Sequence, residues 1–388
     1  MGEQTIRSAF YDVQAAMGAT FVAEGGWYWT EGFGDVEAEY RAVREGVGVW
    51  DVSPLNKWEF RGPDALRAAQ LVHSNDVLGL EIGQVRYGAF LDEDGLMIDD
   101  GTVYRVADER VWVMTNASGH AGFFARVTEG MAVEIEPVTL RMPHVGLQGP
   151  RSRELLEPLT EVDLSALRYF RFVPEPVEVG GVPVWLSRTG FGGELGYELF
   201  TTPERAPDLW KVLVRAGAAP FGVAAIEILR IEAGLIVTDY DYEPHTRTPY
   251  DFSMDRLVAL DAPGEFLGKE RLREIAKRPP NRFVTLALET EEVPEYGAEV
   301  TKDGEPVGVL TSPTRSPRFG VIGLAVLRTE EAGMGNVVEV ALGEDSVPAT
   351  VAPPSSTIRR SAAPGCDLRP PGVTCAGPRP PARVRPGR

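Results

Sequence analysis

The most informative stretch of the chain is Tyr87-Gly-Ala-Phe-Leu-Asp-Glu-Asp-Gly-Leu-Met-Ile-Asp-Asp-Gly101. Its pattern predicts a β-hairpin: a strand, a polar turn with a glycine, and a second strand that ends in Asp99 and Asp100. Aspartate is depleted in strands because its side chain competes for backbone hydrogen bonds, so two in succession require an explanation. They indicate either a solvated strand end or a buried carboxylate with a function.

The alternation of side chains along a strand predicts which of the two aspartates is buried. Counting in steps of two places Asp100 on the same face as Leu96 and Ile98. Asp99 falls on the other face, with Met97. We therefore expect Asp100 to be desolvated, which requires a raised pKa or a cationic partner. This makes Asp100 the candidate catalytic residue and Asp99 its structural neighbour.

The composition indicates a globular protein with more than one domain. A chain of 388 residues, 43% hydrophobic and 25% charged, suggests two or three domains. It has no apolar run of ~18 residues and no basic-then-apolar signal pattern, so we expect a cytoplasmic protein. The formal charge is −18, and the body is more acidic still, because seven arginines and one aspartate follow residue 352. Such a body repels nucleic acid and anionic membranes, so we expect neither as a partner.

The cysteines and histidines argue against several kinds of active site. Both cysteines, Cys366 and Cys375, lie near the end of the chain, so the body offers no cysteine nucleophile, thiolate metal site or disulfide framework. The four histidines show no ligand spacing such as HExxH. We therefore expect no metal.

The remaining pattern predicts an α+β body, a small β-domain and a tail. Residues 57–71 and 144–156 each predict a strand, a Gly-Pro turn and a helix, with proline at the first helical position. Pro279-Pro280 marks a boundary between a body of residues 1–278 and short strands over 279–352. Those strands are typical of an antiparallel barrel or sandwich. Residues 353–388, rich in proline and arginine, are expected to be disordered.

Three further segments bear on binding. Residues 187–200 contain four glycines between positions 190 and 196, which allow a ligand or backbone to approach closely. Glu198 lies just past the end of this loop. No Lys-Ser/Thr follows these glycines, so this is not a phosphate-binding loop. Residues 222–235 predict a helix in which Glu227 and Arg230 pair. Residues 238–250 predict a long polar loop, a kind of segment that often carries function.

Eight short motifs occur in a characteristic order between about residues 20 and 350. They are Asp51-Val-Ser53, Arg61-Gly-Pro-Asp64, Gly95-Leu-Met-Ile-Asp-Asp100, Leu147-Gln-Gly-Pro150, Ser187-Arg-Thr-Gly-Phe-Gly-Gly-Glu194, Gly196-Tyr-Glu198, Leu229-Arg-Ile-Glu-Ala-Gly234 and Phe266-Leu-Gly-Lys-Glu270. In this order they resemble the glycine-cleavage T-protein (aminomethyltransferase) family of tetrahydrofolate-dependent enzymes. The resemblance implies an α+β fold of three domains in a cloverleaf, with a C-terminal antiparallel β-barrel and folate in the central opening.

The resemblance also implies a folate site. The second aspartate of Gly-x-x-x-Asp-Asp, here Asp100, is implied to contact the reacting end of the folate and to be the key acidic residue. Tyr87, Asn116 and Glu198 are implied to line the pocket, with Glu198 accepting hydrogen bonds from the pterin. Arg230 is a further folate-binding candidate, with a structural helix charge as the alternative. Because a folate amine is the nucleophile, Asp100 acts either as general base or as electrostatic stabiliser, and the sequence leaves both roles open.

Departures from the family pattern bear on the one-carbon donor. They are Ile226-Glu227 in place of Arg-Asp, Thr238 in place of a tyrosine, and Pro54-Leu55 in place of His-Met. These departures favour a demethylase-like methyltransferase whose donor is a small sulfonium, quaternary amine or aryl ether. The aromatic loop residues Tyr240, Tyr242 and Tyr250 suit such a cation.

Other donors and functions form the alternatives. The first is the glycine cleavage reaction, aminomethyl transfer from a lipoyl carrier protein. A non-enzymatic folate-binding protein is disfavoured because its Lys-Gly-Cys-Tyr-type motif is absent near Lys269. The folate half of a flavin-dependent amine oxidase is disfavoured because no dinucleotide-binding glycine fingerprint precedes the folate region.

Overall fold

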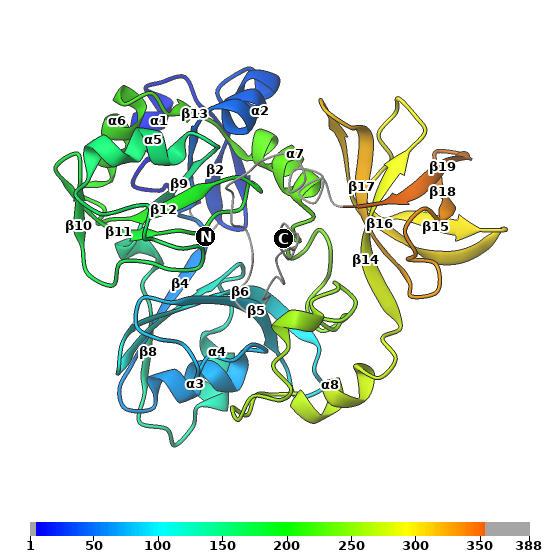
Figure 1. Ribbon diagram of the computed structural model, residues 1–388, viewed down its shortest axis with the longest axis horizontal. Coiled ribbons are helices and arrows are strands. Elements are labelled where there is room, and N and C mark those ends of the chain that lie inside the picture. Colours follow the sequence, from blue (N-terminus) through cyan, green and yellow to red (C-terminus); the bar gives the residue numbers. More distant parts are fainter. Residues whose placement is uncertain (1–4, 354–388) are drawn as a thin grey trace, which may run out of the picture.

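The computed structural model describes residues 5–353, which form two helix-covered sheets, a small hairpin and a barrel (Figure 1). The helices are α1 (Tyr11–Ala15), α2 (Val36–Glu45), α3 (Ala65–Val72), α4 (Ala121–Val127), α5 (Ser152–Leu156), α6 (Ala206–Arg215), α7 (Val223–Ala233) and α8 (Lys269–Ile275), with 3-10 turns η1 (Thr139–Arg141), η2 (Glu157–Leu159) and η3 (Asp255–Leu257). The strands of the body are β1 (Thr20–Glu24), β2 (Trp27–Gly32), β3 (Gly48–Asp51), β4 (Asn56–Arg61), β5 (Val85–Leu91), β6 (Met97–Ala107), β7 (Arg110–Thr115), β8 (Glu134–Pro137), β9 (His144–Gln148), β10 (Val177–Val179), β11 (Val182–Ser187), β12 (Gly196–Phe200) and β13 (Ala219–Pro220). Those of the barrel are β14 (Asn281–Leu288), β15 (Ala298–Lys302), β16 (Glu305–Ser316), β17 (Gly320–Arg328), β18 (Val337–Leu342) and β19 (Asp345–Ala352).

The predicted hairpin is β5–β6, in a five-stranded sheet of order β5-β6-β7-β4-β8. Helix α3 packs on β4 and β7, and α4 packs on β8. The core between them is aromatic, with Phe124 packed edge-on against Trp58 and Phe60. Burial of these apolar faces holds this lobe together.

A second lobe is built on the six-stranded sheet β10-β11-β12-β9-β3-β13. Its core contains Trp210 of α6 and Phe10 before α1, whose rings lie 5.9 Å apart. Helix α7 begins at Val223, ends at the left-handed Gly234, and packs against α2, β2 and the barrel strand β16. Because it contacts both the second lobe and the barrel, α7 links the two.

The two predicted strand–turn–helix units are present as β4–α3 and β9–α5. Gly62 and Gly149 adopt φ of +123° and +136°. A Cβ atom at either would lie 2.5 Å or less from a backbone oxygen of another segment, so both turns require glycine. The prediction that proline takes the first helical position was wrong. Each proline lies two residues before the first residue of its helix, in a turn that a backbone hydrogen bond closes. In the first turn the N–H of Ala65 donates to the carbonyl of Gly62, and in the second the N–H of Ser152 donates to the carbonyl of Gly149, both at 3.0 Å.

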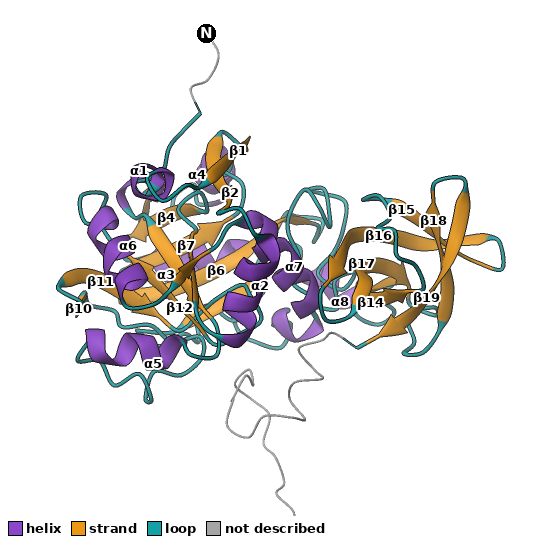
Figure 2. Cartoon of the chain, turned by 90° about the horizontal axis from the view of Figure 1, so that it is seen from above, coloured by secondary structure: helices purple, strands orange, loops and turns teal. Residues whose placement is uncertain are grey.

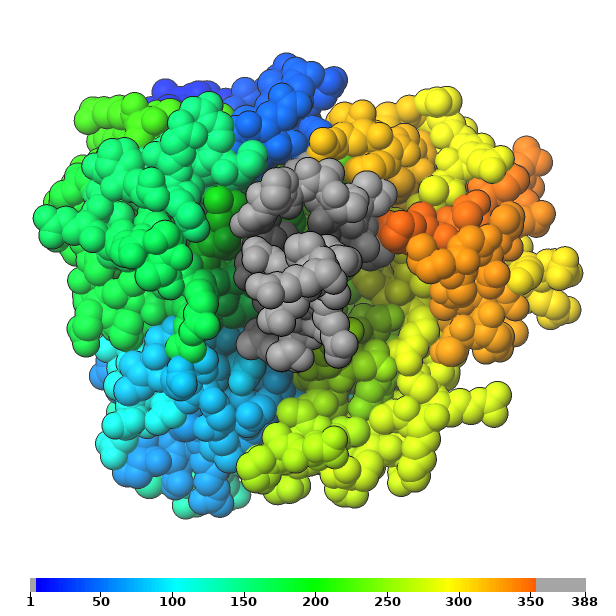
Figure 3. Space-filling model, viewed as in Figure 1, coloured from blue at the N-terminus to red at the C-terminus, as the bar shows by residue number. Residues whose placement is uncertain are grey.

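The last six strands close into a barrel of order β14-β17-β16-β15-β18-β19. Figure 2 shows this barrel at one end of the molecule and the two sheets at the other, and Figure 3 shows the three parts grouped around the middle of one face. The predicted α+β cloverleaf with a C-terminal antiparallel barrel is confirmed. The predicted disordered tail lies outside the described residues, apart from residue 353. Within the described part of the chain, no helix is long and apolar enough to cross a membrane.

The register of the hairpin differs from the simple alternation that the sequence predicts. Asp100 pairs with Ala89 and Asp99 with Phe90, but Leu91 pairs with Met97, so Ile98 has no direct partner. Residues paired across antiparallel strands share a face of the sheet. The Asp100 face therefore includes Met97 and not Ile98, because a β-bulge at Ile98 interrupts the alternation.

Candidate active site

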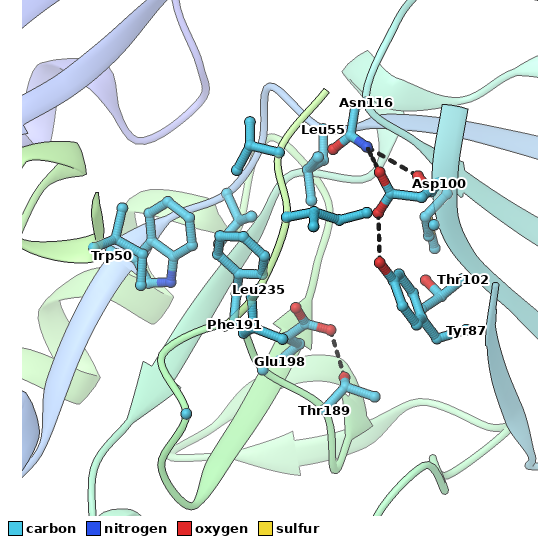
Figure 4. A pocket seen from close by; sticks show the side chains of 18 of the residues that line it. Trp50, Leu55, Tyr87, Asp100, Thr102, Asn116, Thr189, Phe191, Glu198 and Leu235 are labelled. Atoms are coloured by element: carbon cyan, nitrogen blue, oxygen red, sulfur yellow. Dashed lines mark hydrogen bonds between the residues drawn. The ribbon is translucent and has the colours of Figure 1, made fainter. Parts of the chain in front are cut away.

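A central cavity of about 2760 Å³ lies between the two lobes and the loop that follows α7. It is bordered by β5 and β6 of the first lobe, by the glycine-rich loop of the second, and by residues 235–240. Apolar side chains in it include Trp50, Leu55, Phe191 and Leu235 (Figure 4). Four of the five predicted site residues lie in its lining: Tyr87, Asp100, Asn116 and Glu198.

Asp100 is 5% exposed and its carboxylate is held by two phenols. The hydroxyl of Tyr87 donates to Oδ2 at 2.8 Å, and that of Tyr242 donates to Oδ1 at 2.6 Å. Burial, with a smaller contribution from the charge of Asp99, raises the pKa of Asp100 to about 7, although the hydroxyls favour the ionised form. A carboxyl that titrates near neutral pH is suited to proton transfer.

Asp99 is fully buried and organises the backbone beside the site. Its oxygens accept the N–H groups of Asp100 (2.8 Å), Asn116 (3.0 Å) and Ala117 (2.9 Å). They also accept a hydrogen bond from Nδ2 of Asn116 at 2.8 Å, and one of them lies 2.8 Å from Nε2 of His120. Asn116 thus comes directly after β7 with its amide nitrogen already used by Asp99 and by the carbonyl of Asp100.

Glu198 lies on β12, in the other lobe. Its Oε2 accepts the hydroxyls of Thr189, at the start of the glycine-rich loop, and of Tyr104 at 3.2 Å. Its Oε1 accepts no hydrogen bond from the described part of the chain, which leaves it available to a ligand. Desolvation raises the pKa of Glu198, so a ligand with N–H groups would favour its ionised form.

The sequence does not reveal the part played by Lys57. Its side chain is fully buried, and Nζ donates to the carbonyls of Leu55 (2.7 Å) and Ser53 (3.1 Å), fixing the segment that brings Leu55 into the cavity. Burial lowers the pKa of Lys57 to about 7, against the charges of Asp51 and Glu198. A lysine that alternates with aromatic residues in a strand ordinarily indicates a solvent-exposed face, so no local signal predicts this burial.

Arg230 does not line the cavity. It is fully buried and donates to Asp241 at 2.8 Å, to Ser312 of the barrel at 2.8 Å, and to Glu227, as predicted. This position matches the structural alternative for Arg230. Among the loop tyrosines, Tyr240 borders the cavity, whereas Tyr242 and Tyr250 are buried in a core cluster with Met97 and Leu272.

Two lobes and a closed barrel around a cavity with a buried aspartate are the arrangement that the sequence motifs predict. Two family models match the chain: the GCVT N-terminal domain over residues 10–262 and the glycine cleavage T-protein C-terminal barrel domain over residues 281–356. The chain therefore belongs to the glycine cleavage T-protein family.

Individual relatives agree with this assignment. The aminomethyltransferase of Rubrobacter xylanophilus is 38% identical over 352 residues, covering 89% of this chain and 93% of the relative. That of Geobacillus thermodenitrificans is 34% identical over 355 residues, covering 89% and 97%. A crystal structure of glycine cleavage system aminomethyltransferase T from Bartonella henselae has the same fold, with a TM-score of 0.82, 24% identity, and coverage of 91% of this chain and 98% of that one.

The predicted family and its enzyme class, a tetrahydrofolate-dependent transferase, are confirmed by these matches. The relatives are named aminomethyltransferases. They therefore support the aminomethyl alternative rather than the demethylase-like reaction that the departures in sequence favoured.

Proposed function

We propose that this protein is an aminomethyltransferase that moves an aminomethyl-derived carbon from a lipoyl carrier protein to tetrahydrofolate. The observation that carries the proposal is a buried Asp100, held by two phenols, in the wall of a cavity that Glu198 also lines. The names of the relatives favour aminomethyl over methyl transfer.

The residues of the cavity fit a reduced folate. Trp50, Leu55, Phe191 and Leu235 provide the apolar surface on which a planar pterin packs. Glu198 offers an Oε1 that no described residue uses, and a carboxylate oxygen complements the amino and N–H edge of a pterin. We place the pterin edge at Glu198 and the reacting amine nitrogen near Asp100.

Tetrahydrofolate supplies the nucleophilic amine when bound, so no side chain has to form a covalent intermediate. We assign Asp100 the role of general base: it would accept the proton that a folate amine loses as that nitrogen bonds to the transferred carbon. As the bonds of this carbon to the lipoyl sulfur and to its amino group break, the protons released by the two folate nitrogens would pass to these leaving groups, which depart as the lipoyl thiol and ammonia. Its pKa of about 7 allows the carboxylate to be present and still to accept a proton near neutral pH. Tyr87 orients the carboxylate from the cavity side.

The size of the cavity supports a second, large reactant. Ligand pockets typically measure ~300–1,000 Å³, and this cavity is about 2760 Å³. It therefore has space for a carrier-borne arm beside the folate. This favours a protein-bound donor over a small methylated molecule.

One experiment separates the possible donors. The purified protein is incubated with tetrahydrofolate and either aminomethylated lipoyl protein or a panel of methylated sulfonium, quaternary amine and aryl ether compounds. We expect 5,10-methylenetetrahydrofolate from the lipoyl protein only, and about 100-fold less with Asp100→Asn. Formation of 5-methyltetrahydrofolate from a small donor would instead show a demethylase.

Folate binding is tested independently of turnover. A ligand that binds the native state raises its apparent stability, so tetrahydrofolate must raise the midpoint of thermal unfolding. Tetrahydrofolate is titrated against wild-type protein and against Glu198→Gln, which we expect to bind more weakly because its amide opposes pterin N–H groups. If tetrahydrofolate gave the wild type no protection, the proposed function would fail.

A further inference from the structure

We infer that Tyr242 is a positioning residue for Asp100, which it holds as a carboxylate through a hydroxyl relay that begins at Thr238. This inference rests on the proposed function only for its effect on turnover. The hydrogen bonds of the relay form within the folded chain and need no ligand. Tyr242, which carries the relay, does not line the cavity.

The relay consists of two hydrogen bonds. The hydroxyl of Thr238 donates to the hydroxyl of Tyr242 at 2.8 Å, and Tyr242 donates to Oδ1 of Asp100 at 2.6 Å. Thr238 itself lies 3.4 Å from the same oxygen, a much weaker contact. Tyr242 is 4% exposed and burial raises its pKa well above the ordinary value, so its phenol keeps its proton and remains a donor.

This arrangement accounts for one departure from the family pattern. Thr238 stands where the resemblance in sequence implies a tyrosine, and threonine is too short to place a hydroxyl firmly on Asp100. Four residues later, Tyr242 reaches the carboxylate from the core side, opposite the cavity-lining Tyr87. The two phenols hold different oxygens of Asp100, which fixes the plane of the carboxylate.

The loop that carries the relay is held in place by Asp241. Its Oδ2 accepts the N–H of Val237 at 2.9 Å and Nη1 of Arg230 at 2.8 Å, and its Oδ1 accepts the hydroxyl of Ser312 at 2.7 Å. A further bond joins the N–H of Asp239 to the carbonyl of Tyr242 at 2.9 Å. The loop between Thr238 and Tyr242 is therefore fixed to α7 and the barrel, so the phenol has one position relative to Asp100.

The groups around Asp100 determine what removal of the phenol does. The charged group facing it is Asp99, and the neutral donors are Tyr87, Tyr242, Thr238 and, at 3.4 Å, Nδ2 of Asn116. A hydrogen bond to the ionised form of an acid lowers its pKa. Tyr242→Phe removes the shortest such bond and leaves Asp99 in place, so Asp100 holds its proton to higher pH.

The test compares Tyr242→Phe with the control Tyr250→Phe, whose ring lies in the same core cluster but donates no hydrogen bond to Asp100 among the described contacts. The acid limb of the kcat/KM–pH profile is measured for both. We expect Tyr242→Phe to move the midpoint of this limb up by about one pH unit. Because the wild-type midpoint lies at about 7, kcat/KM falls about fivefold at pH 7 and about tenfold well below it, and the loss disappears at alkaline pH. KM for tetrahydrofolate stays unchanged, and Tyr250→Phe keeps the wild-type midpoint.

A second measurement separates this inference from the proposed function. The pH dependence of thermal unfolding is measured without substrate for wild type, Tyr242→Phe, and each combined with Asp100→Asn. At each pH, the difference in stability between a protein and the same protein with Asp100→Asn reports the titration of Asp100. The pH midpoint of this difference must lie higher in the Tyr242→Phe background than in the wild-type background. Equal midpoints in the two backgrounds, or a rate loss that is the same at every pH, would overturn the inference. A shifted midpoint in a protein without transferase activity would uphold it while refuting the function.

Discussion

The Oδ1 atom of Asp99 accepts the backbone N–H of Asp100 at 2.8 Å, so the first aspartate of the pair fixes the backbone of the second. Asp99 is fully buried and its remaining contacts are to Asn116, Ala117, His120 and Thr238. Asp100 instead faces the cavity. The two adjacent carboxylates therefore have separate tasks, and substitutions should separate them.

Asp100→Asn is predicted to remove turnover and to spare the fold. Asparagine keeps the size of the side chain but cannot take up a proton, so we expect kcat to fall by about 100-fold or more. The measurement is steady-state formation of 5,10-methylenetetrahydrofolate, together with a circular dichroism spectrum. Retention of near wild-type kcat in this variant would exclude a catalytic role for Asp100.

Asp99→Asn is predicted to act on stability first. Both oxygens of Asp99 accept backbone or side-chain donors, so an amide nitrogen in either orientation meets an N–H group. We expect a loss of about 3 kcal/mol in the free energy of unfolding, measured in urea. If this variant lost turnover while its unfolding midpoint stayed at the wild-type value, the assignment of the two aspartates would have to be exchanged.

The raised pKa of Asp100 predicts a particular pH dependence of stability. The pKa is about 7 in the folded protein and 3.8 ordinarily, so between these values the folded state binds a proton that the unfolded state lacks. The contribution of this group is therefore complete below ~pH 4 and is lost as the pH rises to ~7. Asp100→Asn removes this titration. The free energy of unfolding of the variant, relative to that of wild type, should therefore increase by about 2–4 kcal/mol when the pH is raised from ~4 to ~8. Urea unfolding at both pH values measures the gain, and a difference independent of pH would contradict the raised pKa.

The hairpin shows both the reach and the limit of prediction from sequence. Residue types predict the strands and the turn, since each depends on a local pattern. Unbroken alternation predicts that Asp100 and Ile98 share a face, and this prediction is wrong because Ile98 is the extra residue of a β-bulge. A bulge depends on the register with the neighbouring strand, which no single strand encodes.

Contacts between distant segments account for what the sequence does not predict at the site. Arg230 carries a charge on a predicted helix, and only the position of the barrel shows that its guanidinium meets Ser312 and Asp241 rather than the cavity. Lys57 lies in a strand whose pattern is typical of a half-exposed sheet, yet its Nζ meets the carbonyls of Ser53 and Leu55. The charges of Asp51 and Glu198, on β3 and β12 of the other lobe, also act on it. Such burial follows from tertiary packing, which overrides local propensity.

Lys57→Met is predicted to weaken folate binding. The change keeps an apolar stem of similar length but removes the donors to the carbonyls of Ser53 and Leu55, which releases a segment of the cavity wall. We expect KM for tetrahydrofolate to rise about tenfold with a smaller change in kcat. Lys211→Met on α6, at an exposed position, is the matched control and should leave both constants unchanged. A fall in kcat at constant KM would place Lys57 in the chemistry instead.

Arg230→Met is predicted to destabilise the protein without weakening its affinity for folate. Removal of the guanidinium leaves Asp241 buried without its cationic partner, and breaking a buried ion pair from one side costs about 3–5 kcal/mol. Arg271→Met, at an exposed position on α8, serves as the control for loss of one positive charge.

The two possible roles of Arg230 give opposite results for this variant. If Arg230 anchors the loop of Asp241, urea unfolding shows the loss of stability, while the Kd of tetrahydrofolate for the folded variant, measured by equilibrium binding, stays within about twofold of wild type. Turnover falls moderately, because the same loop positions Tyr242 against Asp100. If Arg230 instead binds folate, as the resemblance in sequence implies, the Kd rises about tenfold or more and the unfolding curve is unchanged. The fully buried guanidinium, with partners on α7, the loop and the barrel, favours the first result.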